Sequence, residues 1–386
     1  MRKKLLLVSF DAVGSDELPF LRELPNFKHI FSHGSIFPDL KTVFISNTYP
    51  IHASIATGVV PHVHELTSNV MLQPDNPKPW WNYDSRLLKA EPIWDNAAKK
   101  GLTTAAVMWP VTAYAKNIRW NIPEIVTREG ESQVIANLRT GSKLIQIFTY
   151  LRHKKLLRGI EQPERDHFAT ACMKDIIDLR HPDLMLMHLT AYDSLCHEHG
   201  RGSAETLDAL RMMDGFLGTL AESCGKDTSV IVFSDHAQLN VHTAVDPNRI
   251  LELLGYLEYH ENGTVTKDRA VFQNQDGSSF CFNRDLDPEQ LELVRDAVLA
   301  DPAVERLLTK EEMNESGFAG KAEFGICAKE GFYFKAVNNE KATHGYPTDY
   351  PNYNVFFAVS EPWPKLESNS ILEVTKAANK VLGIRD

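Results

Sequence analysis

The chain has 386 residues, of which 43% are hydrophobic, so it can bury a large core and has the composition of a globular protein. Its net charge of −10 would repel a nucleic-acid backbone and argues against DNA or RNA as a partner, although a metal site could still attract a small anionic substrate. The five cysteines are scattered and form no Cys-x-x-Cys pair, so we expect neither disulfides nor a cysteine-ligated zinc.

The amino-terminal segment predicts a buried strand rather than a leader or an anchor. The apolar run Leu5–Phe10 stops at Asp11, and no small-residue cleavage site follows it. No stretch of the sequence approaches the ~20 apolar residues that span a membrane. We therefore expect a soluble, cytoplasmic protein with no membrane partner.

Short apolar runs alternate with helical patterns along the chain, which is typical of α/β proteins with a largely parallel sheet. The runs that we expect to form strands are Leu5–Phe10, Thr103–Trp109, Asp183–Leu189 and Ser229–Ser234. Apolar residues at three- and four-residue spacing predict the helices Pro163–Leu179, Ala204–Ser223 and Pro247–Leu254. The carboxy-terminal stretch should return to the core with Val355–Val359 and a helix over Ile371–Val381.

Two regions interrupt this alternation, and we expect both to be segments inserted into one catalytic core rather than separate domains. Residues 110–162 are aromatic and basic and contain no clear strand. Residues 257–340 have the pattern of a small α+β insert, which leaves 1–256 and 341–386 as the α/β core. Within the insert we expect a strand near Ser279–Phe282, a helix from Asp287 to Leu308 and an apolar segment at Phe332–Phe334.

Acidic and histidine side chains follow three of the predicted strands. Asp11 ends the first strand, Asp193 lies just beyond the third, and Asp235 and His236 directly follow the fourth. Because ligands of open α/β sheets bind at the carboxyl ends of the strands, these side chains should converge on one edge.

Two further histidines extend this set. His197 lies four residues after Asp193 and would share its helix face, and His344 precedes Gly345, which permits a sharp turn. Imidazole and carboxylate groups without thiolate suit zinc or a similar divalent ion in an open, catalytic site.

Thr48 is the candidate nucleophile. Pro50 suits a first helical turn and Gly58 suits a helix end, so Thr48 should stand at a helix amino terminus. Free amides and the helix dipole favour an anion there, and a metal-activated hydroxyl could be aimed at a phosphate.

Each of these residues also has an ordinary explanation when it is taken alone. A strand-end aspartate such as Asp11 is usually a turn or cap residue, and Thr48 could simply cap a helix. His197 or His344 could be surface histidines, and Asp235-His236 is a weak dipeptide signal. Only the joint pattern indicates a metal site.

Four blocks in a fixed order carry a resemblance to a known family. They are Val8–Gly14, Asn47–His52 with Thr57-Gly58 and Pro61–Asn69, Tyr192–Gly200, and Ser234–His236 with Thr343–Tyr346. In this order they resemble the nucleotide pyrophosphatase/phosphodiesterase family of the alkaline phosphatase superfamily. The resemblance implies an alkaline-phosphatase-like three-layer sandwich, with a largely parallel central sheet, helices on both faces and a small α+β insert.

The resemblance also implies two Zn²⁺ ions, with other divalent ions left open. One ion would be held by Asp193, His197 and His344, and the other by Asp11, Asp235, His236 and the hydroxyl of Thr48. Asn69 matches a position that hydrogen-bonds a phosphate oxygen, and Tyr49 matches an aromatic position that stacks on a nucleobase.

The activity implied is that of a zinc-dependent phosphodiesterase or nucleotide pyrophosphatase, which would work through a phospho-Thr48 intermediate on a small phosphorylated substrate such as a nucleotide. The sequence departs from the family pattern without losing a metal ligand, which leaves nucleotide specificity open. The departures are Ile51, Glu65, Cys196, Ala237 and Val111-Thr112.

Other functions stay open. A phosphomonoesterase or phosphonate hydrolase could use the same metal core, although we find no arginine near Thr48 in the sequence, which favours diesters. A non-catalytic metal-binding homologue is the remaining alternative. A sulfatase would need Cys or Ser in place of Thr48 and Arg in place of His52, and a cofactor-independent phosphoglycerate mutase would need Ser and more ligands. We assign His52 and His64 packing or supporting roles.

Overall fold

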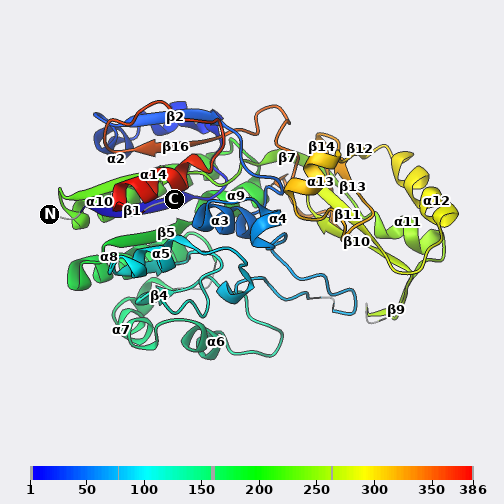
Figure 1. Cartoon of the computed structure of the whole chain (residues 1–386), viewed down its shortest axis with the longest axis horizontal. Coiled ribbons are helices and arrows are strands. Elements are labelled where there is room, and N and C mark those ends of the chain that lie inside the picture. Colours follow the sequence, from blue (N-terminus) through cyan, green and yellow to red (C-terminus); the bar gives the residue numbers. More distant parts are fainter. Residues whose placement is uncertain (1–2, 77, 158–160, 262–263, 385–386) are drawn as a thin grey trace.

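A seven-stranded sheet forms the centre of the computed structural model, which describes residues 3–76, 78–157, 161–261 and 264–384 (Figure 1). Strands β1, β3, β4, β5 and β6 are parallel to one another, whereas β16 is antiparallel to both β6 and β2. In spatial order the strands are β2 (Ser35–Leu40), β16 (Val355–Val359), β6 (Thr228–Phe233), β1 (Lys4–Phe10), β5 (Leu184–Leu189), β3 (Thr104–Val107) and β4 (Trp120–Ile122).

Both faces of this sheet are buried, because its central strands are apolar without alternation. In β1, Leu6, Val8 and Phe10 pack into one layer, and Leu5 and Leu7 pack into the other. The first layer contains α2 (Pro25–Ile30), α8 (Glu164–Arg180), α9 (Ala191–His199) and α10 (Ala204–Cys224). The second contains α3 (Thr48–Thr57), α5 (Ile93–Lys99) and α14 (Glu373–Leu382). The three-layer α/β architecture is confirmed.

A second body of structure lies beyond the carboxyl ends of the strands and has its own hydrophobic core (Figure 1). Its antiparallel sheet contains β10 (Ala270–Gln275), β11 (Ser278–Asn283), β13 (Phe324–Ala328) and β12 (Val304–Leu307). Its helices are α11 (Asn248–Leu253), α12 (Pro288–Leu299) and α13 (Lys310–Glu315), and β8 (Leu257–Tyr259) pairs with β9 (Val265–Asp268).

A three-stranded sheet joins the two bodies. It consists of β14 (Gly331–Phe334), β7 (Leu239–Val245) and β15 (Ala342–Thr343). The remaining α-helices of the core are α1 (Leu18–Leu21) and α4 (Pro61–His64), which have four residues each. Residues 110–162 contain α6 (Gln133–Thr140) and α7 (Lys143–His153). None of the helices in the described part of the chain combines the length and the apolar character that crossing a bilayer requires.

Most of the expected elements form within two residues of their predicted ends, but one predicted helix does not, and one strand forms where we expected none. The helix predicted from Asp287 to Leu308 is wrong, because α12 ends at Leu299 and the chain turns at Asp301-Pro302 into β12. Proline cannot continue the helix, and the Asp301 side chain accepts the Ala303 amide at 2.9 Å in the turn. Residues 110–162 do contain a strand, the three-residue β4, which is too short to give a periodic signal.

Candidate metal centre and active site

The strand ends bring the six expected ligands together. Asp11 directly follows β1, and Asp235 and His236 follow β6. Asp193 and His197 lie one turn apart on α9, just after β5. His344 follows β15 and arrives from the far end of the sequence. These side chains form two groups of three that could each hold a metal ion: Asp11, Asp235 and His236, and Asp193, His197 and His344.

The first group is fully buried. His236 Nε2 lies 3.4 Å from Asp11 Oδ1 and 3.4 Å from Asp235 Oδ2. Both of these carboxylate oxygens lack a hydrogen-bond partner among the described residues. Burial, together with the charges of Asp235 and Asp193, raises the pKa of Asp11 well above its ordinary value. Buried carboxylate oxygens without donors are costly, and a cation would satisfy them.

The second group adjoins the first. The His344 and His236 rings lie 4.3 Å apart between centroids, and His197 Nε2 lies 3.5 Å from Asp193 Oδ1. Although burial opposes it, His197 and His344 hold the pKa of Asp193 below its ordinary value. Burial and the neighbouring His236 lower the pKa of His344, which keeps that imidazole neutral, as a metal ligand must be.

All three histidines direct the same ring nitrogen away from the site. Nδ1 bonds Asn47 Oδ1 at 2.8 Å in His344, the Ala342 carbonyl at 2.9 Å in His197, and the Ala237 carbonyl at 3.3 Å in His236. A donor at Nδ1 leaves the Nε2 lone pair free for a metal ion. The ring orientations therefore fit a two-metal centre.

Thr48 is the first residue of α3, as expected, and only 8% of it is exposed. Its Oγ1 lies 3.2 Å from His236 Nε2, so the hydroxyl reaches into the first ligand group. The helix ends at Gly58, whose φ of 75° is the left-handed conformation that glycine adopts at helix ends. Asn69 Oδ1 accepts the Tyr49 amide at 2.9 Å, which brings the expected phosphate-binding side chain to the start of the same helix.

Tyr49 is less available than the sequence suggested. Its side chain is 1% exposed and packs with Ala53, Leu66 and Tyr83. Trp81 contacts its ring edge-on, with 5.3 Å between ring centroids. Burial leaves little of the ring open for a base to stack on, so the stacking role stays a prediction.

Several buried side chains that sequence reasoning missed hold the ligands in place. His188 Nε2 lies 3.0 Å from Asp11 Oδ2, and its Nδ1 lies 3.3 Å from Glu124 Oε2. Although burial opposes it, these two carboxylates raise the pKa of His188 well above its ordinary value. The sequence does contain an indication of this role, because His188 is the one polar residue in β5, whose sequence is otherwise Leu and Met.

Other supports come from loops and from the second body. Gln238 Nε2 donates to Asp193 Oδ1 at 2.5 Å, and Glu340 Oε2 lies 3.5 Å from His197 Nδ1. Asn47, which orients His344, donates in turn to Gln275 Oε1 at 2.7 Å. Gln275 belongs to β10, so the second body braces the metal centre.

The two histidines to which we assigned no catalytic role are both fully buried. His52 Nδ1 bonds the Thr48 carbonyl at 2.8 Å and lies 3.5 Å from Asp235 Oδ2, behind the ligand groups. His64 Nε2 pairs with Ser54 Oγ at 2.9 Å, and its Nδ1 accepts the Leu66 amide at 3.2 Å. His52, His188 and Asp235 also lie close enough together to hold a metal ion, so the supporting role of His52 stays a prediction.

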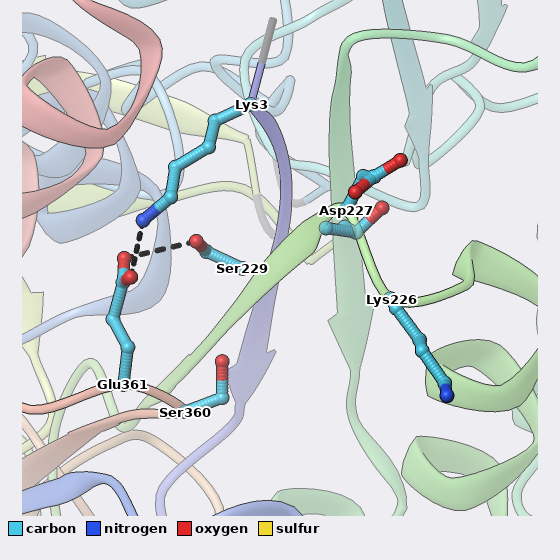
Figure 2. Close-up of a pocket in the computed structure, with 7 residues that line it drawn as sticks. Lys3, Lys226, Asp227, Ser229, Ser360 and Glu361 are labelled. Atoms are coloured by element: carbon cyan, nitrogen blue, oxygen red, sulfur yellow. Dashed lines mark hydrogen bonds and ion pairs between the residues drawn. The ribbon is translucent and has the colours of Figure 1, made fainter. Parts of the chain in front are cut away.

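A pocket of about 260 Å³ elsewhere on the molecule is not this site. Figure 2 shows Lys3, Ser229 and Glu361 in its wall, where Glu361 bonds both of the others. Lys3 precedes β1 and Ser229 is the second residue of β6, so the pocket lies at the amino ends of the strands. The ligand groups lie at the opposite, carboxyl ends.

The family model of type I phosphodiesterase / nucleotide pyrophosphatase matches residues 5–347, which include the six candidate ligands and Thr48. The chain belongs to this family. Among curated family members, mouse (Mus musculus) bis(5'-adenosyl)-triphosphatase is 35% identical over 120 residues, which are 28% of this chain and 25% of that protein. An uncharacterised pyrophosphatase/phosphodiesterase of Schizosaccharomyces pombe is 25% identical over 252 residues, which are 60% of this chain and 44% of its own length. The curated relatives thus match over less than half of their length.

Solved structures share the fold of this family member along nearly the whole chain. Murine ectonucleotide pyrophosphatase/phosphodiesterase 5, in an inactive form in complex with AMP, superposes with a TM-score of 0.68 at 19% identity, covering 100% of this chain and 96% of that one. Phosphonoacetate hydrolase from Sinorhizobium meliloti 1021, in complex with phosphonoacetate, gives a TM-score of 0.71 at 17% identity, covering 99% and 96%. At such identities the likeness concerns the fold.

Proposed function

We propose that this protein is a two-zinc phosphodiesterase or nucleotide pyrophosphatase that hydrolyses phosphate diesters through a phospho-Thr48 intermediate. The observation that carries the proposal is the position of the Thr48 hydroxyl, 3.2 Å from His236 Nε2 at the edge of two adjacent ligand groups. A helix cap alone would not need six buried or half-buried acid and imidazole groups around it.

The ligand groups fit zinc because they offer imidazole nitrogens and carboxylate oxygens and no thiolate. Asp193, His197 and His344 would hold one ion, and Asp11, Asp235 and His236 would hold the other together with the Thr48 oxygen. When bound, two such ions lower the pKa of a coordinated hydroxyl and stabilise the entering and leaving oxygens of an in-line displacement.

The chain's own groups perform the displacement. Thr48 Oγ1 forms a bond to phosphorus while the bond to the leaving oxygen breaks, and the leaving group departs as an alcohol or a phosphate. Asn69 Oδ1 accepts the Tyr49 amide at 2.9 Å, so the side-chain NH2 of Asn69 is the group that would donate to a phosphoryl oxygen. Water then attacks phospho-Thr48 from the opposite side and the bond from phosphorus to Oγ1 breaks. A proton from the attacking water restores the Thr48 hydroxyl, which balances the proton that left with the first leaving group.

We propose a nucleotide-like substrate. The proposal is supported by a hollow beside Asn69 and by what similar proteins are named for or contain. A hollow of about 580 Å³ is lined by Val70, Trp80, Trp81 and Arg128, among others. Val70 directly follows Asn69, and the Asn82 amide bonds the Asn69 carbonyl at 2.8 Å, so this hollow adjoins the phosphate-binding side chain. Its wall combines two tryptophans with Lys78, Arg128, Glu129 and Glu131, and the aromatic side chains suit the organic part of such an ester. One curated relative is named as a diadenosine triphosphatase, and one structural neighbour contains AMP.

A phosphomonoester or phosphonate is the second candidate substrate, because the structure places an arginine, Arg165, beside the start of α9, the helix that carries Asp193 and His197. Arg165 Nη2 donates to Thr190 Oγ1 at 2.7 Å, just before α9, and its buried Nε has no partner among the described residues. Its charge also acts on the Tyr49 phenol, where it opposes the rise in pKa that burial imposes. A guanidinium here could hold the extra charge of a monoester.

The test compares nitrophenol release from bis-p-nitrophenyl phosphate and from p-nitrophenyl phosphate, with and without zinc. A diesterase should prefer the first substrate, and Arg165→Gln should change that rate by less than about tenfold. A preference for the monoester that Arg165→Gln abolishes would favour the second candidate. No zinc-dependent release from either ester would leave a non-catalytic homologue.

We also propose a cytoplasmic location. All five cysteines are free thiols, and four of them are buried. Unpaired cysteines suit a reducing compartment.

A further inference from the structure

Helix α7 presents its apolar stripe to solvent. Leu144, Ile147, Phe148 and Leu151 recur at the three- and four-residue spacing of one helix face, and all four are exposed. Such a stripe normally packs on a core. Here the buried face of the same helix consists of Ile145, Gln146 and Thr149, two of which are polar. Most of the large apolar residues of this helix therefore lie on its solvent-exposed face.

The exposed apolar residues of the molecule are concentrated at this place. Single exposed hydrophobic residues are ordinary, but a cluster marks an interaction surface. Of 18 large hydrophobic residues exposed in the described part of the chain, eight lie between 134 and 156. Besides the four of the stripe they are Val134 and Ile135 on the neighbouring helix α6, Tyr150 and Leu156.

The same segment is basic. Residues 132–160 contain six of the chain's 41 basic residues and none of its 51 acidic ones. Asp175 of α8 pairs with Arg152 at 2.9 Å and with His153 at 2.7 Å, and Glu131 pairs with Arg139. Lys143, Lys154 and Lys155 are in no ion pair among the described residues, so their charges are available to a partner.

This surface lies apart from the proposed catalytic site. Figure 1 shows α6 and α7 beyond the edge strand β4, on the opposite side of the sheet from β2 and away from the second body. A partner on this surface would leave the ligand groups uncovered. We define the α6–α7 surface by Val134, Ile135, Leu144, Ile147, Phe148, Leu151, Lys143, Lys154 and Lys155.

We propose that the α6–α7 surface docks the protein on the face of an anionic lipid bilayer, with the apolar stripe in the interface and the lysines at the level of the headgroups. A helix with an apolar face and basic flanks has this preference, and it lies in the interface without crossing the membrane. The sequence alone led us to expect no membrane partner, because it contains no spanning segment; interfacial docking needs none.

A second copy of the chain fits the same surface less well. In a two-fold dimer the surface would face itself, which would bring lysines against lysines. An anionic lipid surface instead complements them. The net charge of −10 opposes approach at long range, but the Debye length of ~8 Å screens distant charges, so the groups at the contact decide. This inference does not depend on the proposed catalytic activity.

The experiment is sedimentation of the zinc-reconstituted full chain with vesicles of phosphatidylcholine, alone or with about 30% phosphatidylserine. We expect binding to the anionic vesicles only, with loss of binding at high salt. Leu144→Gln combined with Leu151→Gln should weaken it about tenfold or more. The control is Leu253→Gln, because Leu253 is 87% exposed on α11 and Leu144 is 86% exposed on α7. It should bind as the unaltered chain does.

Folding of each variant is checked by its melting temperature, and the oligomeric state by light scattering. No binding to anionic vesicles would overturn the proposal, as would equal losses in the two leucine variants. A dimer in solution that the Leu144/Leu151 variant dissociates would assign the surface to a second copy and would overturn it too. Lys154→Ser with Lys155→Ser gives an independent arm, since it leaves the stripe intact and should reduce binding to the anionic vesicles.

Discussion

Thr48 stands where a helix cap and a nucleophile look alike in the sequence, and its surroundings separate the two roles. If it is the nucleophile, Thr48→Ala should lower diesterase activity by several powers of ten, each about 1.4 kcal/mol of barrier, with little loss of stability. Thr48→Ser should keep substantial activity, because the hydroxyl survives and only the methyl group that restricts its rotamer is lost. The measurement is steady-state hydrolysis of an aryl phosphodiester by the three proteins.

Zinc content is measured on each of these variants, since six other ligands should retain the metal in Thr48→Ala. If Thr48 were only a cap, alanine would cost about 1 kcal/mol of stability and little activity. A fully zinc-loaded Thr48→Ala protein within about tenfold of the unaltered rate would therefore refute the nucleophile and the double displacement.

His64 makes the stability of the molecule depend on pH. Burial lowers its pKa from 6.5 to about 4, whereas the unfolded chain would keep the ordinary value. Between these values the unfolded state binds the extra proton, so the free energy of unfolding falls as the pH falls from 6.5 toward 4. The full loss from this residue is roughly 3 kcal/mol.

The check is urea unfolding of the zinc-reconstituted chain and of His64→Gln over this pH range. The variant should be less stable at pH 7, because glutamine cannot replace both bonds of the ring, but its stability should fall less steeply with acid. Parallel curves would mean that His64 does not titrate as its burial indicates.

Residue types after the strands were enough to predict four candidate ligands, Asp11, Asp193, Asp235 and His236. The prediction of His197 rested on its spacing from Asp193, and that of His344 on the following glycine and the family resemblance. No such pattern predicted the groups that orient the ligands. Asp11 and Asp235 follow apolar runs, and this pattern is visible along the sequence without knowledge of the fold. His188 meets Asp11 only because β5 pairs with β1, so its role is a product of the sheet. The burial of Tyr49 under Trp81 likewise depends on a loop conformation that no periodicity encodes.

At the scale of elements, α9 depends on its neighbour for a cap. The Asp166 carboxylate, buried on α8, accepts the Thr190 and Ala191 amides at 2.9 Å each, at the start of the helix that carries Asp193 and His197. Asp166→Ala should cost about 1–3 kcal/mol of stability, since it leaves buried amides unsatisfied. It should also weaken zinc binding, because the helix carrying two ligands would loosen.

Asp214 provides a matched control. It is equally buried on α10 and accepts the Phe27 amide at 2.7 Å and the Asn26 amide at 3.2 Å at the start of α2, which carries no ligand. Asp214→Ala should lose similar stability and keep its zinc affinity. Equal zinc affinity in the two variants would show that the α9 cap supports the fold alone.

The α+β insert marks the limit of reading elements from the sequence. Its strand near Ser279–Phe282 was predictable from a β-rich run, but the helix was extended through Pro302 because apolar residues continue beyond it. β10 supplies Gln275, which bonds Asn47 behind His344, and this contact joins residues 228 positions apart. Such contacts follow from tertiary packing and have no local signature.

For the whole molecule, the parallel sheet and its two helical layers were predictable because each central strand is a continuous apolar run between helical patterns. The edge strands β2 and β4 were not, because one is half-exposed and the other has only three residues. The edges of a sheet contribute least to its core and so leave the weakest pattern in the sequence.

Metal binding should stabilise the molecule as a whole, because the two ligand groups join elements from residue 11 to residue 344 that come together only in the folded state. An ion at about 1,000 times its dissociation constant adds about 4 kcal/mol, which is roughly 5 °C for a chain of this length. Chelation by EDTA should therefore lower the melting temperature by roughly 5–10 °C without unfolding the protein, which has a large core of its own. Elemental analysis of the reconstituted protein should find two divalent ions per chain. If melting and activity were both indifferent to EDTA, or if no metal remained after reconstitution, the buried acids would need another partner and the two-metal mechanism would be wrong.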